Sequence, residues 1–184
     1  MTSIISVIET FSGRPFTPLA PIPAEIIIED IAHALGNQGR FAGHSRFRYS
    51  VGEHSVRVSE LLERTGHPYV VQLWGLLHDA SEAYLVDLPT PLKYGTLMGV
   101  EYLKAETALM RSICFRFALP PEEPEPVRVA DAVLLATEVR DLMHPDRPHW
   151  KGLKGRPLAE RIRPWADGVA ESEFLLRYRR LVGL

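Results

Sequence analysis

The chain has 184 residues, of which 46% are hydrophobic and 24% charged, and its formal net charge at pH 7 is -2. This length and composition fit one globular domain and exclude a disordered protein. The slightly negative charge argues against a broad phosphate-binding surface, so we expect no nucleic acid among the partners, although a small basic pocket for one anionic ligand stays compatible. Since no apolar run reaches the roughly 18 residues of a membrane span, no membrane partner is expected.

The cysteine content and the first residues indicate the compartment. Cys114 is the single cysteine, which excludes an internal disulfide and fits a reducing cytosol. Its apolar neighbours Ile113 and Phe115 predict a buried thiol rather than a reactive one. The stretch before Glu9 is short and lacks the basic flank of a signal peptide. We therefore expect a cytoplasmic protein.

The N-terminal segment 1–27 predicts little regular structure. Its prolines and the turn signal at Ser12-Gly13 prevent a long helix, although Ile4–Thr10 fits one short strand. The chain shows no internal repeat and no low-complexity linker. We therefore expect a single domain over 1–184, with the segment 1–27 packed on it.

From residue 28 onward the pattern predicts helices. An apolar face with helical spacing predicts an amphipathic helix that ends before Gly66. The next helix has Pro68 in its first turn and is apolar nearly all round, which indicates a central, buried position, and it is expected to include His78, Asp79 and Glu82. The expected fold is all-α, a bundle of about five to seven helices. The expected helices are 30–35, 51–65, 68–82, 101–117, 127–142 and 167–181, and the expected loops are 39–44, 87–92, 120–126 and 145–157.

Three of these helices each place a metal-binding group among apolar residues. The pair His78-Asp79 follows an apolar run, Asp131 lies inside another, and His54 is on the core-facing side of its helix. An ionised carboxylate in such surroundings is costly unless it is paired or bound to metal. Two imidazoles and two carboxylates suit a divalent first-row metal.

Each candidate also has an ordinary structural explanation. His54 alone would more often be a hydrogen-bonded core histidine, and Asp131 could stabilise a helix N-terminus. Glu138 and Asp141 are most simply solvated or bonded to Arg140. The set taken together favours a metal site.

Glu82 lies four residues after His78, which places both on one face of a continuous helix. A carboxylate beside a metal site that is not itself a ligand can act as general acid or base. The alternative is a surface glutamate on an amphipathic turn.

At these residues the sequence resembles the HD-domain phosphohydrolases, whose pattern is a histidine, then His-Asp, then a distant aspartate. The segments from His78 to Glu82 and from Asp87 to Tyr94 resemble the bacterial 5′-deoxynucleotidase branch of that family, and also phage dATP triphosphohydrolases. The matching motifs cover roughly 40–141. The resemblance implies an HD-domain helical bundle, a nucleotide substrate and a homo-oligomer, a dimer or larger.

The resemblance also implies roles for individual residues. His54, His78, Asp79 and Asp131 would hold one divalent transition metal (Co, Mn, Zn, Fe or Ni), and Glu82 and Asp79 would be catalytic. Substrate contacts would come from Arg40, Phe41, Asp87, Thr90 and Lys93. Among them, Asp87 would lie against the sugar and disfavour a ribose 2′-hydroxyl, and Lys93 and Arg40 would face the phosphate. The nucleotidases carry tryptophan where this chain has Phe41.

The expected reaction is dephosphorylation of a 5′-deoxynucleoside monophosphate. A triphosphohydrolase of the dATP type is the alternative, and basic residues between Lys151 and Arg163, including Lys154 and Arg156, are compatible with it if their loop reaches the pocket. A phosphodiesterase would need further ligands from His33, His44, His144 and His149, which lack a recognisable spacing. A degenerate nucleotide sensor is the non-enzymatic reading.

For two other groups of residues, the sequence allows two interpretations each. Arg46, Arg48 and Tyr49 form either a phosphate-facing cluster or, more simply, a solvated basic loop. The apolar residues of the last helix dock either on the core, which is the commoner outcome, or on a second subunit; they are Phe174, Leu175, Leu176, Tyr178 and Leu181.

Overall fold

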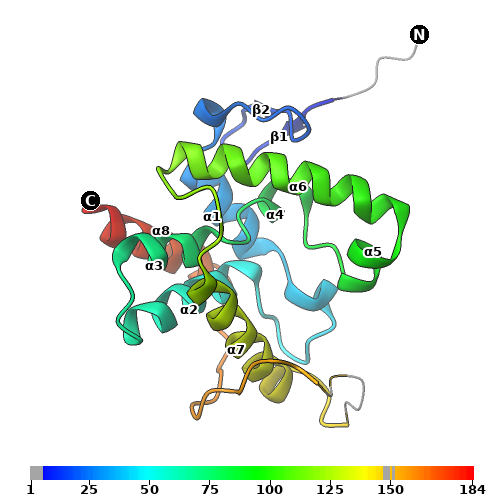
Figure 1. Cartoon of the computed structure of the whole chain (residues 1–184), viewed down its shortest axis with the longest axis vertical. Helices are drawn as coiled ribbons and strands as arrows, with labels where there is room; N and C mark the ends of the chain where they lie inside the picture. The colour runs from blue at the N-terminus through cyan, green and yellow to red at the C-terminus, as the bar shows by residue number, and fades with distance from the viewer. Residues whose placement is uncertain (1–5, 147–149, 151) are drawn as a thin grey trace.

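The computed structural model describes residues 6–146, 150 and 152–184, and it is mainly helical (Figure 1). The predicted all-α architecture is confirmed: within the described part of the chain, seven α-helices are longer than the single turn α4. The α-helices are α1 (Ile28–Asn37), α2 (Val51–Arg64), α3 (Tyr69–Leu77), α4 (Glu82–Leu85), α5 (Thr90–Gly95), α6 (Leu97–Arg116), α7 (Glu125–Leu142) and α8 (Val169–Val182). Two 3-10 helices also occur, η1 (Pro23–Glu25) and η2 (Arg40–Gly43).

Helix α2 is the centre of the bundle, because it packs against α1, α3, α7 and α8. Its start is fixed by Ser50, whose hydroxyl accepts a hydrogen bond from the backbone N–H of Glu53. From Val51 to Val56 every side chain is buried, which is why a histidine in this helix lies inside the molecule. Close packing with α3 depends on Gly75, where an added Cβ would lie 2.4 Å from a methyl group of Leu62.

The N-terminal segment forms a small hairpin in which β1 (Ile8–Glu9) pairs antiparallel with β2 (Pro15–Phe16). The strand expected over 4–10 is thus shorter, and residues 4 and 5 lie outside the described residues. Phe16 is buried and its ring stacks on Tyr84 of α4 at 4.2 Å. Asp30 of α1 accepts hydrogen bonds from the backbone N–H and hydroxyl of Ser12. The hairpin therefore docks on the helices beside α4.

The structure corrects three helix boundaries. The helix expected to carry His78, Asp79 and Glu82 ends at Leu77, and a turn of 78–81 precedes α4. In that turn the backbone bonds tighten to the i→i+3 type, as from the N–H of Glu82 to the carbonyl of Asp79, so Glu82 is not on a continuous face with His78. The expected loop 87–92 becomes helical at residue 90, where Pro91 suits the first turn of α5. Helix α6 begins at Leu97, four residues earlier than expected, because Thr96 caps it.

The last helix docks on the core of the bundle. Phe174 is fully buried against it, and Leu175, Tyr178 and Leu181 pack there partly buried, whereas Leu176 is 60% exposed. Cys114 is buried in α6, as predicted. Within the described residues, every helix is too short or too polar to cross a lipid bilayer.

Candidate metal centre

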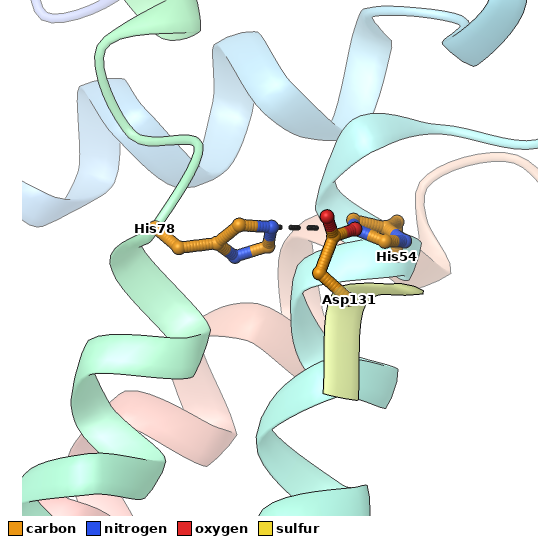
Figure 2. A group of neighbouring side chains, drawn as sticks. All are labelled: His54, His78 and Asp131. Atoms are coloured by element: carbon orange, nitrogen blue, oxygen red, sulfur yellow. Dashed lines mark hydrogen bonds and ion pairs between the residues drawn. The ribbon is translucent and has the colours of Figure 1, made fainter. Parts of the chain in front are cut away.

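Side chains from three parts of the bundle converge on one point, where His54 is fully buried and the side chain of Asp131 is 40% exposed (Figure 2). His54 comes from α2, Asp131 from α7 and His78 from the residue after α3, and one potential ligand atom of each lies within 4.8 Å of the others. His54 Nε2 is 3.2 Å from His78 Nε2 and 3.1 Å from Asp131 Oδ1. Atoms bound to one cation at about 2.0–2.2 Å lie about 3 Å apart, so this spacing fits a metal centre.

Asp79 adds a fourth electron-rich atom next to the two imidazoles. Its Oδ2 lies 3.2 Å from His78 Nε2 and 3.8 Å from His54 Nε2. The carboxylate is 21% exposed, whereas the side chain of His54 has no exposed surface. Asp79 is therefore a neighbour of both imidazoles, which lie deeper in the protein than the carboxylates of Asp79 and Asp131.

The partners of the two imidazoles determine which nitrogens are available. His54 Nδ1 lies 2.6 Å from Glu138 Oε1, and His78 Nδ1 lies 2.8 Å from the carbonyl oxygen of Gly75. Because both partners are acceptors, each Nδ1 carries a proton, and in the neutral ring each Nε2 presents a lone pair. Two lone pairs and the carboxylate of Asp131 within 4.8 Å of one another fit a divalent cation, and the partners at Nδ1 orient metal-binding histidines in general.

Without a cation, protons balance the charge of this cluster. Burial lowers the pKa of His78, but Asp79 and Asp131 outweigh it and raise that pKa to about 10. Burial and Arg40 lower the pKa of His54, yet Glu138 and Asp131 raise it overall. Burial raises the pKa of Asp79, but the nearby cations, His78 first, bring it well below its usual range. Bound metal would compete with these protons.

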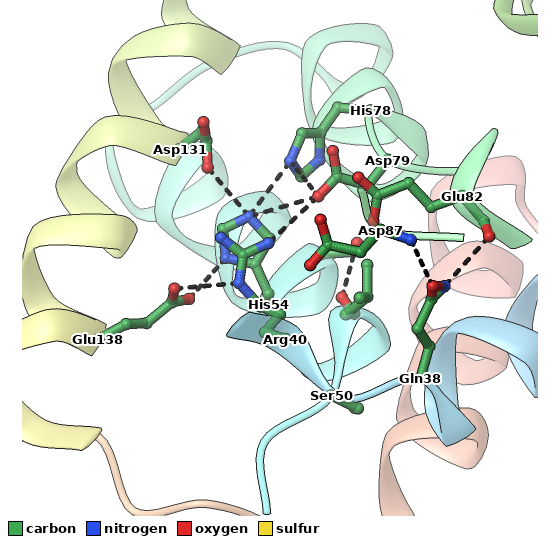
Figure 3. Close-up of polar contacts among 12 residues, drawn as sticks. Gln38, Arg40, Ser50, His54, His78, Asp79, Glu82, Asp87, Asp131 and Glu138 are labelled. Carbon is green, nitrogen blue, oxygen red and sulfur yellow. Dashed lines mark hydrogen bonds and ion pairs between the residues drawn. The ribbon is translucent and has the colours of Figure 1, made fainter. Parts of the chain in front are cut away.

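Glu82 faces the same cluster from α4 (Figure 3). Its side chain is 7% exposed, and the atom Oε2 is buried without a hydrogen-bond partner among the described residues. Burial, followed by the charges of Asp79 and Asp87, raises the pKa of Glu82 well above its ordinary value. A buried carboxyl group with a raised pKa beside a candidate metal centre is suited to proton transfer.

Gln38 links Glu82 to the segment that follows α4. Its amide nitrogen donates to the carbonyl oxygen of Glu82, and its amide oxygen accepts from the backbone N–H of Asp87 at 2.6 Å. Val86, which lies between Glu82 and Asp87, has a φ of 64°, a backbone region that valine rarely adopts. The hydroxyl of Tyr102 donates to the carbonyl oxygen of Val86. These bonds hold Asp87, a predicted substrate contact, near the cluster.

Arg40 lies beside the cluster, with its side chain 12% exposed. Its Nε donates to Glu138 at 3.1 Å and its Nη1 donates to Asp79 at 3.4 Å (Figure 3). The next two residues, Phe41 and Ala42, both have left-handed backbone angles, with φ of 56° and 50°. The Phe41 ring is partly buried and meets Trp150 edge-on at 6.0 Å. The predicted Arg-aromatic pair therefore stands at the rim of the site on a strained turn.

Two further predicted substrate contacts, Lys93 and Thr90, differ in how far they are exposed. Lys93 is partly buried and its Nζ pairs with Glu106 at 2.7 Å, whereas Thr90, at the start of α5, is exposed. Arg48 is exposed and bonds to Asp167 and to the carbonyl oxygen of Gly36, as a solvated loop would predict, but Tyr49 of the same group is buried and donates to Glu138.

Within the second basic loop, Arg156 lies away from the cluster, whereas Trp150 meets the ring of Phe41. Arg156 lines a hollow together with Pro126, Val129 and Val133. Val129 and Val133 each lie two residues from Asp131, about 200° around α7, so this hollow is on the opposite face of the helix. Lys151 and His149 lie outside the described residues.

Glu138 is the main residue that the sequence argument misjudged. It was expected to be solvated or bonded to Arg140, but it has no exposed surface and contacts His54, Arg40 and Tyr49. Arg140 instead pairs with Asp141, a pair that the sequence also predicts. The spacing of seven residues from Asp131, two helical turns, was the available signal, since it places Glu138 on the face of α7 that holds the ligand.

The chain is similar to two curated bacterial proteins, and no protein-family model matches it. It is 38% identical over 179 residues to Escherichia coli YfdR, an uncharacterized protein, and the match covers 96% of both chains. The chain belongs to the YfdR family. An uncharacterized protein of Rhodobacter capsulatus is 35% identical over 169 residues, covering 83% of this chain and 85% of that protein. The match to YfdR thus spans nearly the whole length of both chains.

Proposed function

We propose that this member of the YfdR family is a metal-dependent phosphohydrolase of the HD-domain type that removes the phosphate of a 5′-deoxynucleoside monophosphate. The observation that carries the proposal is the convergence of His54, His78 and Asp131, with Asp79 in contact with both imidazoles. The resemblance to HD-domain phosphohydrolases assigns the same four residues to the metal. The buried carboxyl of Glu82 beside them supports a catalytic rather than a structural metal.

The donor set fits a divalent transition metal, which when bound would supply positive charge to the phosphate and lower the pKa of a nearby water molecule. In the hydrolysis, water adds to phosphorus, the bond from phosphorus to O5′ breaks, and the departing oxygen needs a proton. Glu82 is the group placed to move that proton, because its Oε2 has no partner in the described structure and its pKa is raised. Asp79 holds its negative charge beside the imidazoles throughout.

Arg40 is the cationic side chain best placed for the phosphate. The contacts of its guanidinium with Glu138 and Asp79 use Nε and Nη1, which leaves Nη2 for a phosphate oxygen. Lys93 adds a second positive charge, close enough for Glu82 to influence its pKa. The partly buried ring of Phe41, next to Arg40, offers a surface on which a base can stack.

The distribution of charge favours a monophosphate over a triphosphate. Among the described residues, Arg40 and Lys93 are the cationic side chains whose charge acts on Glu82, and each is already paired with a carboxylate. Arg156, a further positive charge that a triphosphate could use, lines a hollow on the opposite face of α7. A triphosphate carries about four negative charges and would meet Asp79, Asp87 and Asp131 with little compensation.

Product analysis tests the proposal. Metal-free protein is loaded separately with Mn, Co, Zn, Fe or Ni and incubated with deoxynucleoside monophosphates, their ribose counterparts and deoxynucleoside triphosphates. We expect inorganic phosphate and a deoxynucleoside from the monophosphates, and no product from an Asp131→Asn control. Tripolyphosphate as product would identify a triphosphohydrolase instead, and absence of any product with all five metals would contradict a hydrolytic function.

A further inference from the structure

Glu138 is the centre of a buried polar network behind the metal centre. Its Oε1 accepts from His54 Nδ1 at 2.6 Å and from the hydroxyl of Tyr49 at 2.9 Å, and its Oε2 accepts from Arg40 Nε at 3.1 Å (Figure 3). Glu138, His54 and Tyr49 have at most 1% of their surface exposed. Both carboxylate oxygens are thus satisfied by protein donors, and no water is needed to complete the network.

The position of Glu138 determines what His54 can do. An imidazole whose Nδ1 donates to a carboxylate keeps its proton on that nitrogen, so that Nε2 remains available as a ligand. The same bond fixes the rotation of the ring, and it directs Nε2 to within 3.2 Å of His78 Nε2 and 3.1 Å of Asp131 Oδ1. A charged acceptor also makes the imidazole a stronger donor of electron density to a metal.

Glu138 also controls Arg40. Arg40 bridges Glu138 and Asp79. The carboxylate of Glu138 therefore orients both His54 and the guanidinium of Arg40, which lies beside the proposed ligand Asp79. Without the charge of Glu138, Arg40 would be left with Asp79 as its anionic partner and would compete with the metal for that carboxylate.

We infer that Glu138 is a positioning residue that holds His54 and Arg40 in the arrangement needed to bind the metal. The inference rests on the metal site of the proposed function, but it does not depend on which substrate is hydrolysed. Its consequence is that a side chain with no contact to the metal sets the metal affinity. Residues of this kind change metal affinity by about 10–100-fold when they are replaced.

The test measures metal affinity directly, by competition of the purified protein with a chromophoric chelator for Zn or Co. Glu138→Gln keeps the shape and a neutral acceptor for His54 Nδ1, and we expect it to weaken binding by about tenfold, whereas Glu138→Ala should weaken it by up to about 100-fold. Tyr49→Phe removes one donor but keeps the carboxylate, and its effect should be smaller than that of Glu138→Gln. Circular dichroism and the melting temperature show whether each variant is folded.

Glu53→Gln is the matched control. Glu53 is also buried and precedes His54, but its oxygens accept from Arg57 and from the backbone N–H of Trp165 rather than from the cluster. This variant should keep the wild-type metal affinity even if its melting temperature falls.

The outcomes separate the inference from the proposed function. A wild-type protein that binds metal, together with a folded Glu138→Gln variant of equal affinity, would overturn the positioning role alone. Equal weakening in Glu53→Gln and Glu138→Gln would also overturn it, because the effect would then be general destabilisation. Metal binding without hydrolysis would contradict the proposed function and leave the inference standing. A wild-type protein that binds no divalent metal would overturn both.

Discussion

Replacing Glu82 by glutamine removes one ionisable group and changes almost nothing in size. The side chain is 7% exposed, and its Oε2 has no hydrogen-bond partner in the described part of the chain. General acid-base catalysis by a positioned side chain contributes about 10²–10⁴-fold to a rate, which corresponds to about 3–5 kcal/mol of barrier. We therefore expect kcat of the metal-loaded Glu82→Gln variant to fall by that factor, with unchanged metal content.

The same substitution has an effect on stability that does not depend on activity. Burial and the charges of Asp79 and Asp87 raise the pKa of Glu82 in the folded protein. An unfolded glutamate ionises at about pH 4.3, so the native carboxyl destabilises the fold increasingly as the pH rises above that value. Glutamine cannot ionise. In the metal-free proteins, the melting temperature of Glu82→Gln should therefore rise relative to that of the wild type as the pH increases above about 4.

Phosphate release from a deoxynucleoside monophosphate, with metal content from elemental analysis, gives the kinetic result, and calorimetry at several pH values gives the thermal one. Glu123→Gln is the control, because Glu123 is another partly buried carboxylate whose pKa is affected by the charge of His78. It should leave kcat nearly unchanged. Turnover close to wild type in metal-loaded Glu82→Gln would remove Glu82 from the mechanism, and a melting difference independent of pH would refute the assignment of its raised pKa.

Three further predictions follow from the metal centre and the core. Asp79→Ala should lose its metal by elemental analysis, and full occupancy in that variant would contradict the ligand assignment. His54 and His78 must release protons to bind metal, and in the metal-free protein the pKa of His78 is raised to about 10. The apparent metal affinity should therefore rise by about tenfold per pH unit for each proton displaced between about pH 6 and 9. A metal affinity that does not depend on pH would contradict this. Phe174→Ala should reduce the unfolding free energy by about 3–5 kcal/mol in urea denaturation, because Phe174 is fully buried, whereas the exposed Leu176→Ala should change it by less than about 0.5 kcal/mol.

Most of the candidate metal centre could be predicted because each proposed ligand is an unusual residue in its local context. His78-Asp79 and Asp131 interrupt apolar runs, which predicts buried groups with a shared partner; the side chain of His78 is largely buried, whereas the side chains of Asp79 and Asp131 are 21% and 40% exposed. The spacing within α2 and α7 predicts the faces of His54 and Asp131, whereas His78 and Asp79 lie in the turn after α3. The all-α fold followed from the same periodicity, and it is confirmed.

What the sequence could not show depends on contacts between distant segments. Glu138 was judged by its neighbour Arg140, but its real partners are 84–98 residues away in the chain, on α2 and on the segment that precedes it. Gln38 gave no signal, because its role arises from two backbone groups that flank the turn at Val86. The end of α3 at Leu77 was missed because the turn at 78–81 differs from a helix only in the span of its hydrogen bonds.

The most direct test of a metal-dependent phosphohydrolase centred on His54, His78, Asp79 and Asp131 is a reconstitution titration. Metal-free protein is titrated with Mn or Co while phosphate release from a deoxynucleoside monophosphate is followed. We predict that activity starts from zero, rises linearly and saturates at one metal per chain. Activity that is already full in the chelated protein, or no phosphate release at any metal ratio, would contradict the proposed function.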